Sequence, residues 1–442
     1  MKRRPVSIAL CGLGTVGRET ARLLMAGRSR FRRRLGAELR LACVCDRDAV
    51  REARTLGLPA SVRRSKDWRQ ALADPAVDLV VELFGGYEEA GRLVLAALAA
   101  GKGVVTANKL LLSRRWDALA AAAERKGAPL HFEAAVAGGV PIIRTLRAGL
   151  AADRVDEVHG ILNGTTNFIL SAMAHSGATR TDAVREAQRL GYAEKDPTLD
   201  LNGTDAAHKV SILASLLAGR WLPPAAVPRD GIEAVDTADI AWAVAELKRT
   251  VRLVGTAIVR GRGETPAVEA HVRPTLVPLL HPLAGVHGGN NALLVRAASA
   301  GELMFYGPGA GAGPTASAVL ADVLAAAGGI LGGPDNPGQE GMLEASGGRP
   351  CRAVAEAPAP HYLRFSVRDV PGALARIAGV LGKLGVSIAR IHQDDPPGGA
   401  RSVPVHIVTH TAERAVIDKA RRAVTALSPG EVSHACLRLW PA

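Results

Sequence analysis

The chain has 442 residues, of which 48% are hydrophobic, and a formal net charge of +13. This length predicts two or three domains with buried cores. The positive charge is spread along the chain and aromatic residues make up only 3%, too few to stack bases, so the composition excludes specific nucleic-acid recognition. No apolar run reaches the ~18 residues that span a bilayer, and the charged start leads into a strand pattern, so we expect a cytoplasmic protein without a membrane partner.

The first motif is a glycine-rich loop between a predicted strand and a predicted helix. Residues 5–11 are apolar, residues 12–17 read GLGTVG, and a helical run continues to residue 24. Gly12 permits a tight turn, Gly14 lets the backbone approach a pyrophosphate, and Gly17 allows the helix to pack closely on the strand. The loop predicts a dinucleotide-binding domain whose cofactor contacts come from Gly12, Leu13, Gly14, Thr15, Val16 and Gly17.

The next predicted strand, residues 39–45, ends at Asp46, where an acidic residue would bond the adenosine ribose. Asp46 therefore favours NAD. Arg47 and the arginines of residues 30–34 could instead neutralise the additional phosphate of NADP, although a run of arginines is also typical of a solvated helix end. The sequence leaves the choice between NAD and NADP open.

Lys109 follows the predicted strand that begins at residue 103. Ligands bind at the carboxyl ends of strands in a doubly wound sheet, so Thr106, Asn108 and Lys109 are predicted to lie beside the nicotinamide. The alternative for Lys109 is a surface lysine at the start of a helix.

Residues 191–209 place several charged groups around turn residues. Glu194, Asp196 and Asp200 lie in a turn-rich loop, and an apolar helical run follows from about residue 204 to Gly219. Asp205 and Lys209 are four residues apart and share one face of that helix. Taken alone, such a pair is commonly a solvated surface ion pair, but its neighbours indicate a substrate site.

Four segments, at residues 132–146, 159–170, 191–209 and 306–319, together closely resemble the homoserine dehydrogenase family. The resemblance runs from about Val6 to Leu331. It implies an α/β protein with a Rossmann-type NAD(P)-binding domain over residues 1–135, completed by a helix near residues 315–331. An α+β substrate-binding and dimerisation domain is implied over residues 136–314, with a homodimer or homotetramer as the assembly.

The resemblance implies reversible NAD(P)-dependent reduction of L-aspartate 4-semialdehyde to L-homoserine, in threonine, methionine and isoleucine biosynthesis. An ammonium beside the carbonyl oxygen would stabilise the developing alkoxide and deliver the proton. We assign this role first to Lys209 and second to Lys109, with Asp205 orienting the lysine. An aldehyde-oxidising enzyme would instead need a nucleophilic cysteine, and none of the five cysteines lies near the substrate motifs.

The remaining substrate contacts follow from the charge of the amino-acid substrate. Glu194, assisted by Asp200, would accept hydrogen bonds from its ammonium group. Residues 163–166 would line the opposite wall, although such a polar turn also serves to cap a helix. The predicted substrate-binding residues are Glu194, Asp200, Gly164, Thr165 and Lys109, and Gly307 is expected to return close to the nicotinamide.

The resemblance also implies a monovalent cation near the domain junction, with sodium as its occupant. The matching positions are Glu133, Val136, Gly138 and Val140, which would act largely through backbone carbonyl oxygens. The alternative is a Gly-Gly turn that opens a helix and holds no ion.

Residues 332–358 are rich in Gly and Pro and are predicted to form a linker. The pattern over residues 359–442 is β-α-β-β-α-β, which resembles an ACT domain. Asp369, Gly372 and Ala373 match the turn that commonly binds an amino-acid effector there, so L-threonine is a possible effector, although many such modules only support assembly. A non-catalytic amino-acid sensor built on a dehydrogenase scaffold is the alternative for the whole chain, and the intact set Lys109, Glu194, Asp205 and Lys209 argues against it.

Overall fold

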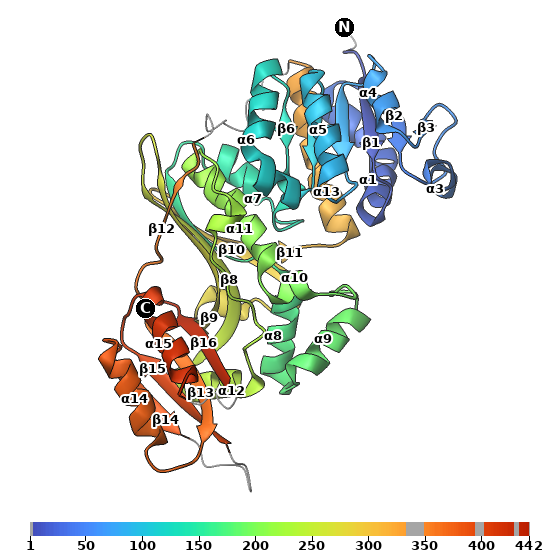
Figure 1. Ribbon diagram of the computed structural model, residues 1–442. Coiled ribbons are helices and arrows are strands. Elements are labelled where there is room, and N and C mark those ends of the chain that lie inside the picture. Colours follow the sequence, from blue (N-terminus) through green and yellow to red (C-terminus); the bar gives the residue numbers. More distant parts are fainter. Residues whose placement is uncertain (1–2, 333–348, 394–401, 428–432, 442) are drawn as a thin grey trace.

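The computed structural model describes residues 3–332, 349–393, 402–427 and 433–441. The nucleotide-binding domain lies at one end of the molecule, the substrate domain in the middle and the C-terminal domain at the other end (Figure 1).

The nucleotide-binding domain is built on a parallel six-stranded sheet with strand order β3-β2-β1-β4-β5-β6. Its core strands are buried on both faces, as apolar strands covered by helices should be. The strand order reverses between β1 and β4, which is where such sheets bind ligands. The strands are β1 (Val6–Cys11), β2 (Leu39–Cys45), β3 (Arg63–Ser65), β4 (Leu79–Glu82), β5 (Gly103–Thr106) and β6 (Leu130–His131).

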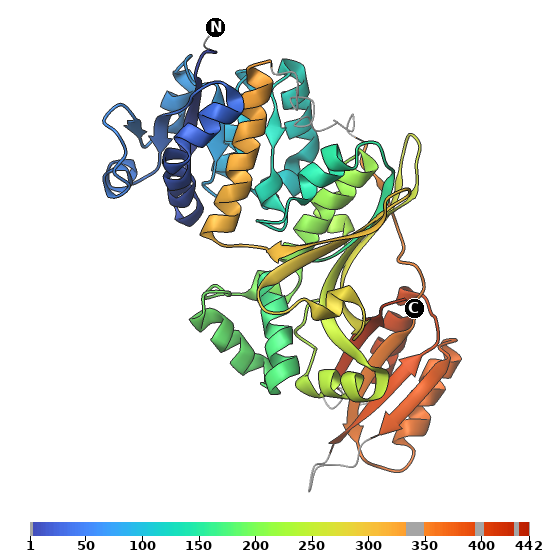
Figure 2. The same ribbon diagram turned by 180° about the vertical axis from the view of Figure 1, so that it is seen from behind.

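Helices cover both faces of this sheet (Figures 1 and 2). They are α1 (Thr15–Ala26), α2 (Arg28–Leu35), α3 (Ala49–Thr55), α4 (Trp68–Ala73), α5 (Glu88–Ala99), α6 (Lys109–Lys126) and, from much later in the chain, α13 (Ala312–Ile330). By length and composition α13 could cross a membrane, but it packs against α1 and β5 of this domain. Its apolar character is therefore explained by burial within the domain.

The substrate domain contains an antiparallel sheet with strand order β11-β10-β7-β8-β9. Helix α11 packs on β8 and β9 and so holds the substrate segment against the sheet. The strands are β7 (Val155–Ile161), β8 (Arg249–Gly261), β9 (Ala267–Pro278), β10 (Asn290–Ala297) and β11 (Gly301–Pro308). The helices are α7 (Ile142–Arg144), α8 (Gly164–Ser176), α9 (Arg180–Arg189), α10 (Thr198–Leu201), α11 (Thr204–Ala218) and α12 (Thr237–Leu247), with short helical turns η1 (Glu133–Ala135), η2 (Thr145–Gly149), η3 (Pro224–Ala226) and η4 (Pro282–Gly285).

The C-terminal domain has the predicted β-α-β-β-α-β order. It consists of β13 (His361–Arg368), α14 (Ala373–Lys383), β14 (Ile388–Gln393), β15 (Ser402–Thr409), α15 (Arg414–Thr425) and β16 (Ser433–Leu439). The strand order is β16-β13-β15-β14. The predicted fold class, including the ACT domain, is confirmed.

One feature of the sheets was not predicted, because the C-terminal domain was expected to be separate. Strand β16 pairs in parallel with β9, with Arg438 opposite Thr275 and Leu439 opposite Leu276, so one continuous sheet runs through both domains. Of the predicted linker, residues 333–348 lie outside the described residues, and β12 (Arg352–Val354) pairs with β9. An open edge of β9 is thereby covered.

Candidate active site

A cavity of about 420 Å³ lies between the nucleotide-binding domain and the substrate domain. Its walls come from the glycine-rich loop, the ends of β4 and β5, the start of α6 and the segment around α10 and α11. It is lined by Val16, Glu82, Leu83, Gly85, Gly86, Ala107, Asn108, Lys109, Leu110, Glu194, Asp196, Leu199, Asp200, Thr204, Asp205 and His208. A small polar substrate could therefore meet a cofactor bound at the sheet edge.

Lys109 is the first residue of α6, and its neighbour Asn108 fixes the start of that helix. The Asn108 side chain accepts a hydrogen bond from Leu111 N at 3.0 Å and donates one to Gly86 O at 2.8 Å. An Asn cap satisfies an amide at the helix start and fixes the direction of the chain. Lys109 is thus held at the carboxyl end of β5.

Asp205 joins the two predicted catalytic lysines. Its Oδ1 lies 3.1 Å from Lys109 Nζ, and its Oδ2 lies 2.8 Å from Lys209 Nζ. Lys209 also donates to Leu162 O at 2.6 Å. Lys109 lines the cavity, whereas Lys209, whose side chain is 11% exposed, is not among the lining residues, so the two ammonium groups contact different oxygens of one carboxylate.

The charges of this trio reinforce one another. Burial opposes ionisation of Asp205, but Lys209 and Lys109 outweigh it and lower the pKa of that carboxyl below its usual value. The charge of Asp205 in turn raises the pKa of Lys109 despite the opposing effect of burial. Asp205 therefore stays ionised and Lys109 stays protonated across the physiological range.

Asn163 connects this trio to the predicted substrate carboxylate Asp200. Its amide nitrogen donates to Asp200 Oδ1 at 2.7 Å and to Asp205 Oδ2 at 2.9 Å. Its Oδ1 accepts from Thr166 N at 2.8 Å and caps α8. Burial, followed by repulsion from Asp205, raises the pKa of Asp200, and Asn163 opposes this rise. The turn at residues 163–166 therefore both caps a helix and orients two carboxylates.

The other predicted substrate residues are divided between the cavity and its support. Glu194 is exposed and lines the cavity beside Asp200. Thr165 and Gly164 lie outside the lining: Thr165 donates to Tyr192 O at 2.6 Å, and a Cβ at Gly164 would lie 2.5 Å from Gly289 O. Through these contacts Gly164 and Thr165 support the loop that carries Glu194 and Asp200.

The glycine-rich loop has the geometry that a dinucleotide requires. Gly12 has a φ of +103°, and a Cβ there would lie 2.5 Å from Leu83 C, while a Cβ at Gly17 would lie 1.9 Å from Gly12 O. A Cβ at Gly14 would meet nothing within 4 Å, so the backbone there is open to a ligand. Val16 lines the cavity, and Leu13 and Thr15 complete the loop that begins α1.

Asp46 lies next to this loop, at the end of β2. Its Oδ2 accepts from Leu13 N at 2.7 Å and its Oδ1 accepts from Asp48 N at 3.0 Å. Arg47 is exposed beside it. Gly307 lies in β11, opposite Asn291 and with its would-be Cβ 3.5 Å from Val140, at the junction between the two domains.

The segment with the predicted cation positions is a tight turn at the same junction. Ala137 and Gly138 have φ values of 56° and 48°, and a Cβ at Gly138 would lie 2.4 Å from Gly309 O. Both carboxylate oxygens of Glu133 accept backbone amides, from Ile143 and Arg144, at 2.8 Å each. Among the four predicted carbonyl oxygens, those of Glu133 and Val140 each accept one backbone amide, from Val136 at 3.4 Å and from Ile142 at 2.8 Å, and each keeps a second lone pair.

The predicted effector turn lies in the C-terminal domain, away from the cavity (Figure 1). Gly372 has a φ of +83° and precedes Ala373, the first residue of α14. Asp369 Oδ1 lies 3.4 Å from the side-chain nitrogen of Gln393 on β14. All three turn residues are at least partly accessible.

Two titratable residues of the cavity, Glu82 and His208, were missed by the reasoning from sequence. Glu82 ends β4, and its buried carboxylate accepts from Thr106 Oγ1 at 2.6 Å and Phe84 N at 2.9 Å. His208 Nδ1 lies 2.8 Å from Ser113 Oγ. A carboxylate at the end of an apolar parallel strand was a usable signal for Glu82. His208 stands beside Lys209 in a helical run, and no sequence pattern distinguishes it from a core histidine.

Comparison with known proteins identifies the family. Residues 12–133 match the family model "Homoserine dehydrogenase, NAD binding domain", residues 141–324 match "Homoserine dehydrogenase", and residues 361–428 match "ACT domain". Homoserine dehydrogenase of Neisseria gonorrhoeae is 39% identical over 441 residues, which cover 99% of each chain.

Solved structures agree with this match. The crystal structure of a homoserine dehydrogenase from Thiobacillus denitrificans superimposes with a TM-score of 0.87 at 36% identity, covering 100% of this chain and 99% of that one. A hyperthermophilic archaeal homoserine dehydrogenase in complex with NADPH gives 0.61 at 29% identity, covering 73% of this chain and 97% of that one. This chain therefore belongs to the homoserine dehydrogenase family and is an oxidoreductase with a nicotinamide-cofactor domain and a C-terminal ACT domain.

Proposed function

We propose that this enzyme reduces L-aspartate 4-semialdehyde reversibly to L-homoserine, on the route to threonine, methionine and isoleucine, in the cytoplasm. The observation that carries the proposal is the Lys109–Asp205–Lys209 unit at a cavity bordered by the glycine-rich loop. An aldehyde carbonyl that accepts a hydride develops negative charge on its oxygen, and two ammonium groups on one carboxylate suit that charge.

The cofactor would lie along the glycine-rich loop, and when bound it supplies the hydride. The open backbone at Gly14 and the crowded packing at Gly12 and Gly17 fit a pyrophosphate at the start of α1. Asp46 would contact the adenosine ribose of NAD, and Arg47 the 2′-phosphate of NADP. An archaeal relative binds NADPH, which supports the phosphorylated cofactor.

We assign proton donation to Lys209 and polarisation of the carbonyl to Lys109. Lys109 lines the cavity, and Asp205 raises its pKa, which makes it a strong electrostatic partner but a weak acid. Lys209 is almost fully buried, and donation from it would leave Asp205 paired with the other lysine. The carboxylates of Glu194 and Asp200 would receive the substrate ammonium at the other wall of the cavity.

We further propose that the turn at residues 133–140 binds a sodium ion through the carbonyl oxygens of Glu133, Val136, Gly138 and Val140. The successive positive φ angles at Ala137 and Gly138 support this, because they turn the backbone sharply within a few residues. Carbonyl oxygens suit a hard monovalent cation. Its role would be to stiffen the junction between the two domains.

We propose that L-threonine is an effector of the ACT domain and binds at the turn of Asp369, Gly372 and Ala373. We also propose that the protein assembles as a homodimer or homotetramer. The ACT match supports amino-acid sensing. The exposed strands β11 and β14 at the two ends of the continuous sheet support self-association, since open sheet edges favour pairing with another chain.

The direct test is oxidation of NADPH and of NADH by the purified protein with L-aspartate 4-semialdehyde, with and without millimolar L-threonine. Turnover supports the proposed reaction and ranks the cofactors. Absence of turnover from protein that still binds the cofactor would overturn the reaction and favour the non-catalytic sensor. Thermal melting with and without sodium in the buffer tests the cation, because its removal should lower the melting temperature.

A further inference from the structure

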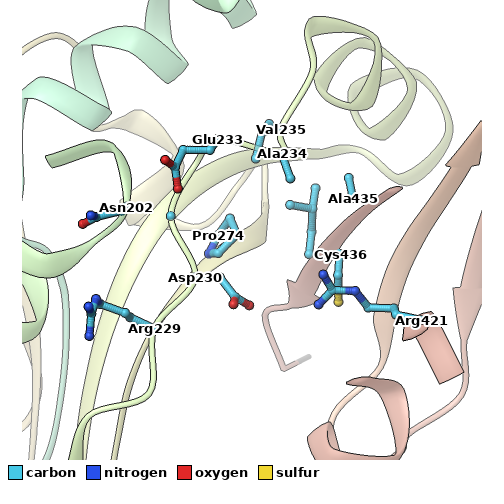
Figure 3. A pocket seen from close by; sticks show the side chains of 12 residues that line it. Asn202, Arg229, Asp230, Glu233, Ala234, Val235, Pro274, Arg421, Ala435 and Cys436 are labelled. Carbon is cyan, nitrogen blue, oxygen red and sulfur yellow. The ribbon is translucent and has the colours of Figure 1, made fainter. Parts of the chain in front are cut away.

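A second cavity, of about 510 Å³, lies between the substrate domain and the ACT domain (Figure 3). One wall is the loop that precedes α12, another is β9 at Pro274, and the third comes from Arg421 on α15 and residues 435–437 of β16. The pairing of β16 with β9 involves only Arg438 and Leu439, and Pro274 has no amide to extend the ladder. The cavity opens where the two strands stop pairing.

The charged groups of this cavity differ in how many ion-pair and hydrogen-bond partners they have. Asp230 is held by two arginines, with Oδ2 2.5 Å from Arg414 and 3.1 Å from Arg273. Arg421 reaches Asp418 at 3.1 Å through Nη1, but its Nε is buried without a hydrogen-bond partner among the described residues. That nitrogen is closed to solvent, but the Arg421 side chain lines the cavity and is 19% exposed, so the accessible part of its guanidinium can receive a carboxylate.

Arg229 and Glu233 complete the set on the opposite wall. Within the described part of the chain, neither side chain has an assigned hydrogen bond or ion pair, and both are exposed. Figure 3 shows Glu233 and Arg229 on the loop wall, across the cavity from Arg421. The cavity therefore presents the Arg229 guanidinium and the Glu233 carboxylate without assigned partners, together with Arg421, which is paired only with Asp418 among the described residues, and this set matches a ligand with at least one carboxylate and one ammonium group.

The same loop wall is fastened to the active-site segment. Ile232 N donates to Leu201 O at 2.8 Å, and a Cβ at Gly231 would lie 1.9 Å from that same oxygen. Asn202 lines this cavity, whereas Asp200 and Asp205 line the active-site cavity. The two cavities thus share a wall of a few residues, and the loop at residues 229–235 is joined directly to the segment that carries both carboxylates.

We propose that this cavity binds a small α-amino acid, with its carboxylate on Arg421 and its ammonium group on Glu233, and that occupancy changes substrate affinity through Leu201 and Asn202. This site is separate from the ACT turn at residues 369–373. The coupling rests on the proposed function, whereas binding itself does not.

The test is calorimetric titration of the full-length protein with L-threonine, L-aspartate, L-homoserine and inorganic phosphate. We expect at least one of the amino acids to bind. Its affinity should fall about tenfold or more in Arg421→Met and also in Glu233→Gln, because each substitution removes one charged contact with the ligand. Arg422→Met, the neighbouring exposed arginine of α15, is the matched control and should retain the affinity. Asp369→Asn reports on the ACT turn: it should weaken only the separate binding of L-threonine proposed there and retain the affinity of this cavity.

Several results would overturn the proposal. One is that no amino acid binds at concentrations up to about 10 mM. Another is an affinity that is unchanged in both Arg421→Met and Glu233→Gln. A third is that binding is lost only in Asp369→Asn. Phosphate binding that depends on Arg421 but not on Glu233 would replace the amino acid by an anion. Amino-acid binding that leaves the KM for L-aspartate 4-semialdehyde unchanged would reject the coupling alone, and binding in a protein without turnover would reject only the proposed reaction.

Discussion

Asp205 Oδ1 lies 3.1 Å from Lys109 Nζ, although the two residues are 96 positions apart and belong to different domains. Lys109 is fixed by the capped start of α6, and Asp205 by the first turn of α11. The contact closes the active-site cavity between the domains and makes its charge pattern depend on how the domains are packed.

Removing the charge of Asp205 should change the pH dependence of turnover. Asp205 raises the pKa of Lys109, so in Asp205→Asn that pKa falls and the ammonium is lost at a lower pH. The alkaline limb of the kcat profile should therefore move to lower pH, and kcat at neutral pH should fall about 100-fold. An unshifted alkaline limb would show that Lys109 does not govern it.

Two glycines of the cofactor loop should respond differently to the same substitution. Gly12→Ala places a Cβ 2.5 Å from Leu83 C at a positive φ, so we expect the melting temperature to fall by about 5 °C or more. Gly14→Ala meets nothing in the free protein and should keep the melting temperature while weakening NADPH binding. Thermal melts and a cofactor titration on both variants test this, and equal effects of the two would contradict the assigned roles.

Asp322 should make stability at the domain junction depend on pH. Its Oδ2 accepts from Glu133 N at 2.7 Å and its Oδ1 lies 3.1 Å from Arg144, but burial, followed by Glu133, raises the pKa of Asp322 to about 7. Because the pKa is raised in the folded state, the protonated Asp322 carboxyl stabilises the fold. Its contribution to the free energy of unfolding is complete at low pH and is lost as the pH rises to about 7. The melting temperature of Asp322→Asn relative to the unmodified protein should therefore increase from pH 5 to pH 8. A difference that stays constant with pH would contradict this.

The attachment of the ACT domain should depend on a buried ion pair. Asp239 on α12 is fully buried and accepts hydrogen bonds from Arg364 Nε and Tyr362 OH, each at 2.6 Å. Arg364→Met leaves this carboxylate without its cation, which costs about 3–5 kcal/mol in buried pairs, so the melting temperature should fall by several degrees. Arg376→Met, an exposed arginine of α14, is the control and should melt like the unmodified protein. Equal melting of the two variants would show that Arg364 contributes nothing.

Local patterns predicted the parts of the site that lie within one element. The four-residue spacing placed Asp205 and Lys209 on one face of α11, and the GLGTVG loop placed the cofactor turn at the start of α1. Contacts between domains left no such signal. Nothing in the spacing shows that Lys109 reaches Asp205, and the resemblance assigned both residues to the site without predicting their contact.

The pairing of β16 with β9 was equally invisible in the sequence. Edge strands of two domains pair through their unpaired backbone N–H and C=O groups. Because nearly every residue has these groups, the amino-acid sequence does not reveal which edges pair. The βαββαβ order could therefore be predicted, whereas the continuous sheet and the cavity beside Pro274 could not.

The central claim is that the buried ammonium of Lys209 donates the proton beside Asp205. The most direct measurement is single-turnover NADPH oxidation after mixing L-aspartate 4-semialdehyde with cofactor-loaded Lys209→Met, with Lys126→Met in the exposed last turn of α6 as the control. The account predicts a loss of about 100-fold or more in Lys209→Met with NADPH affinity retained, and an unchanged rate in the control. A rate in Lys209→Met within about threefold of the unmodified enzyme would contradict the assignment.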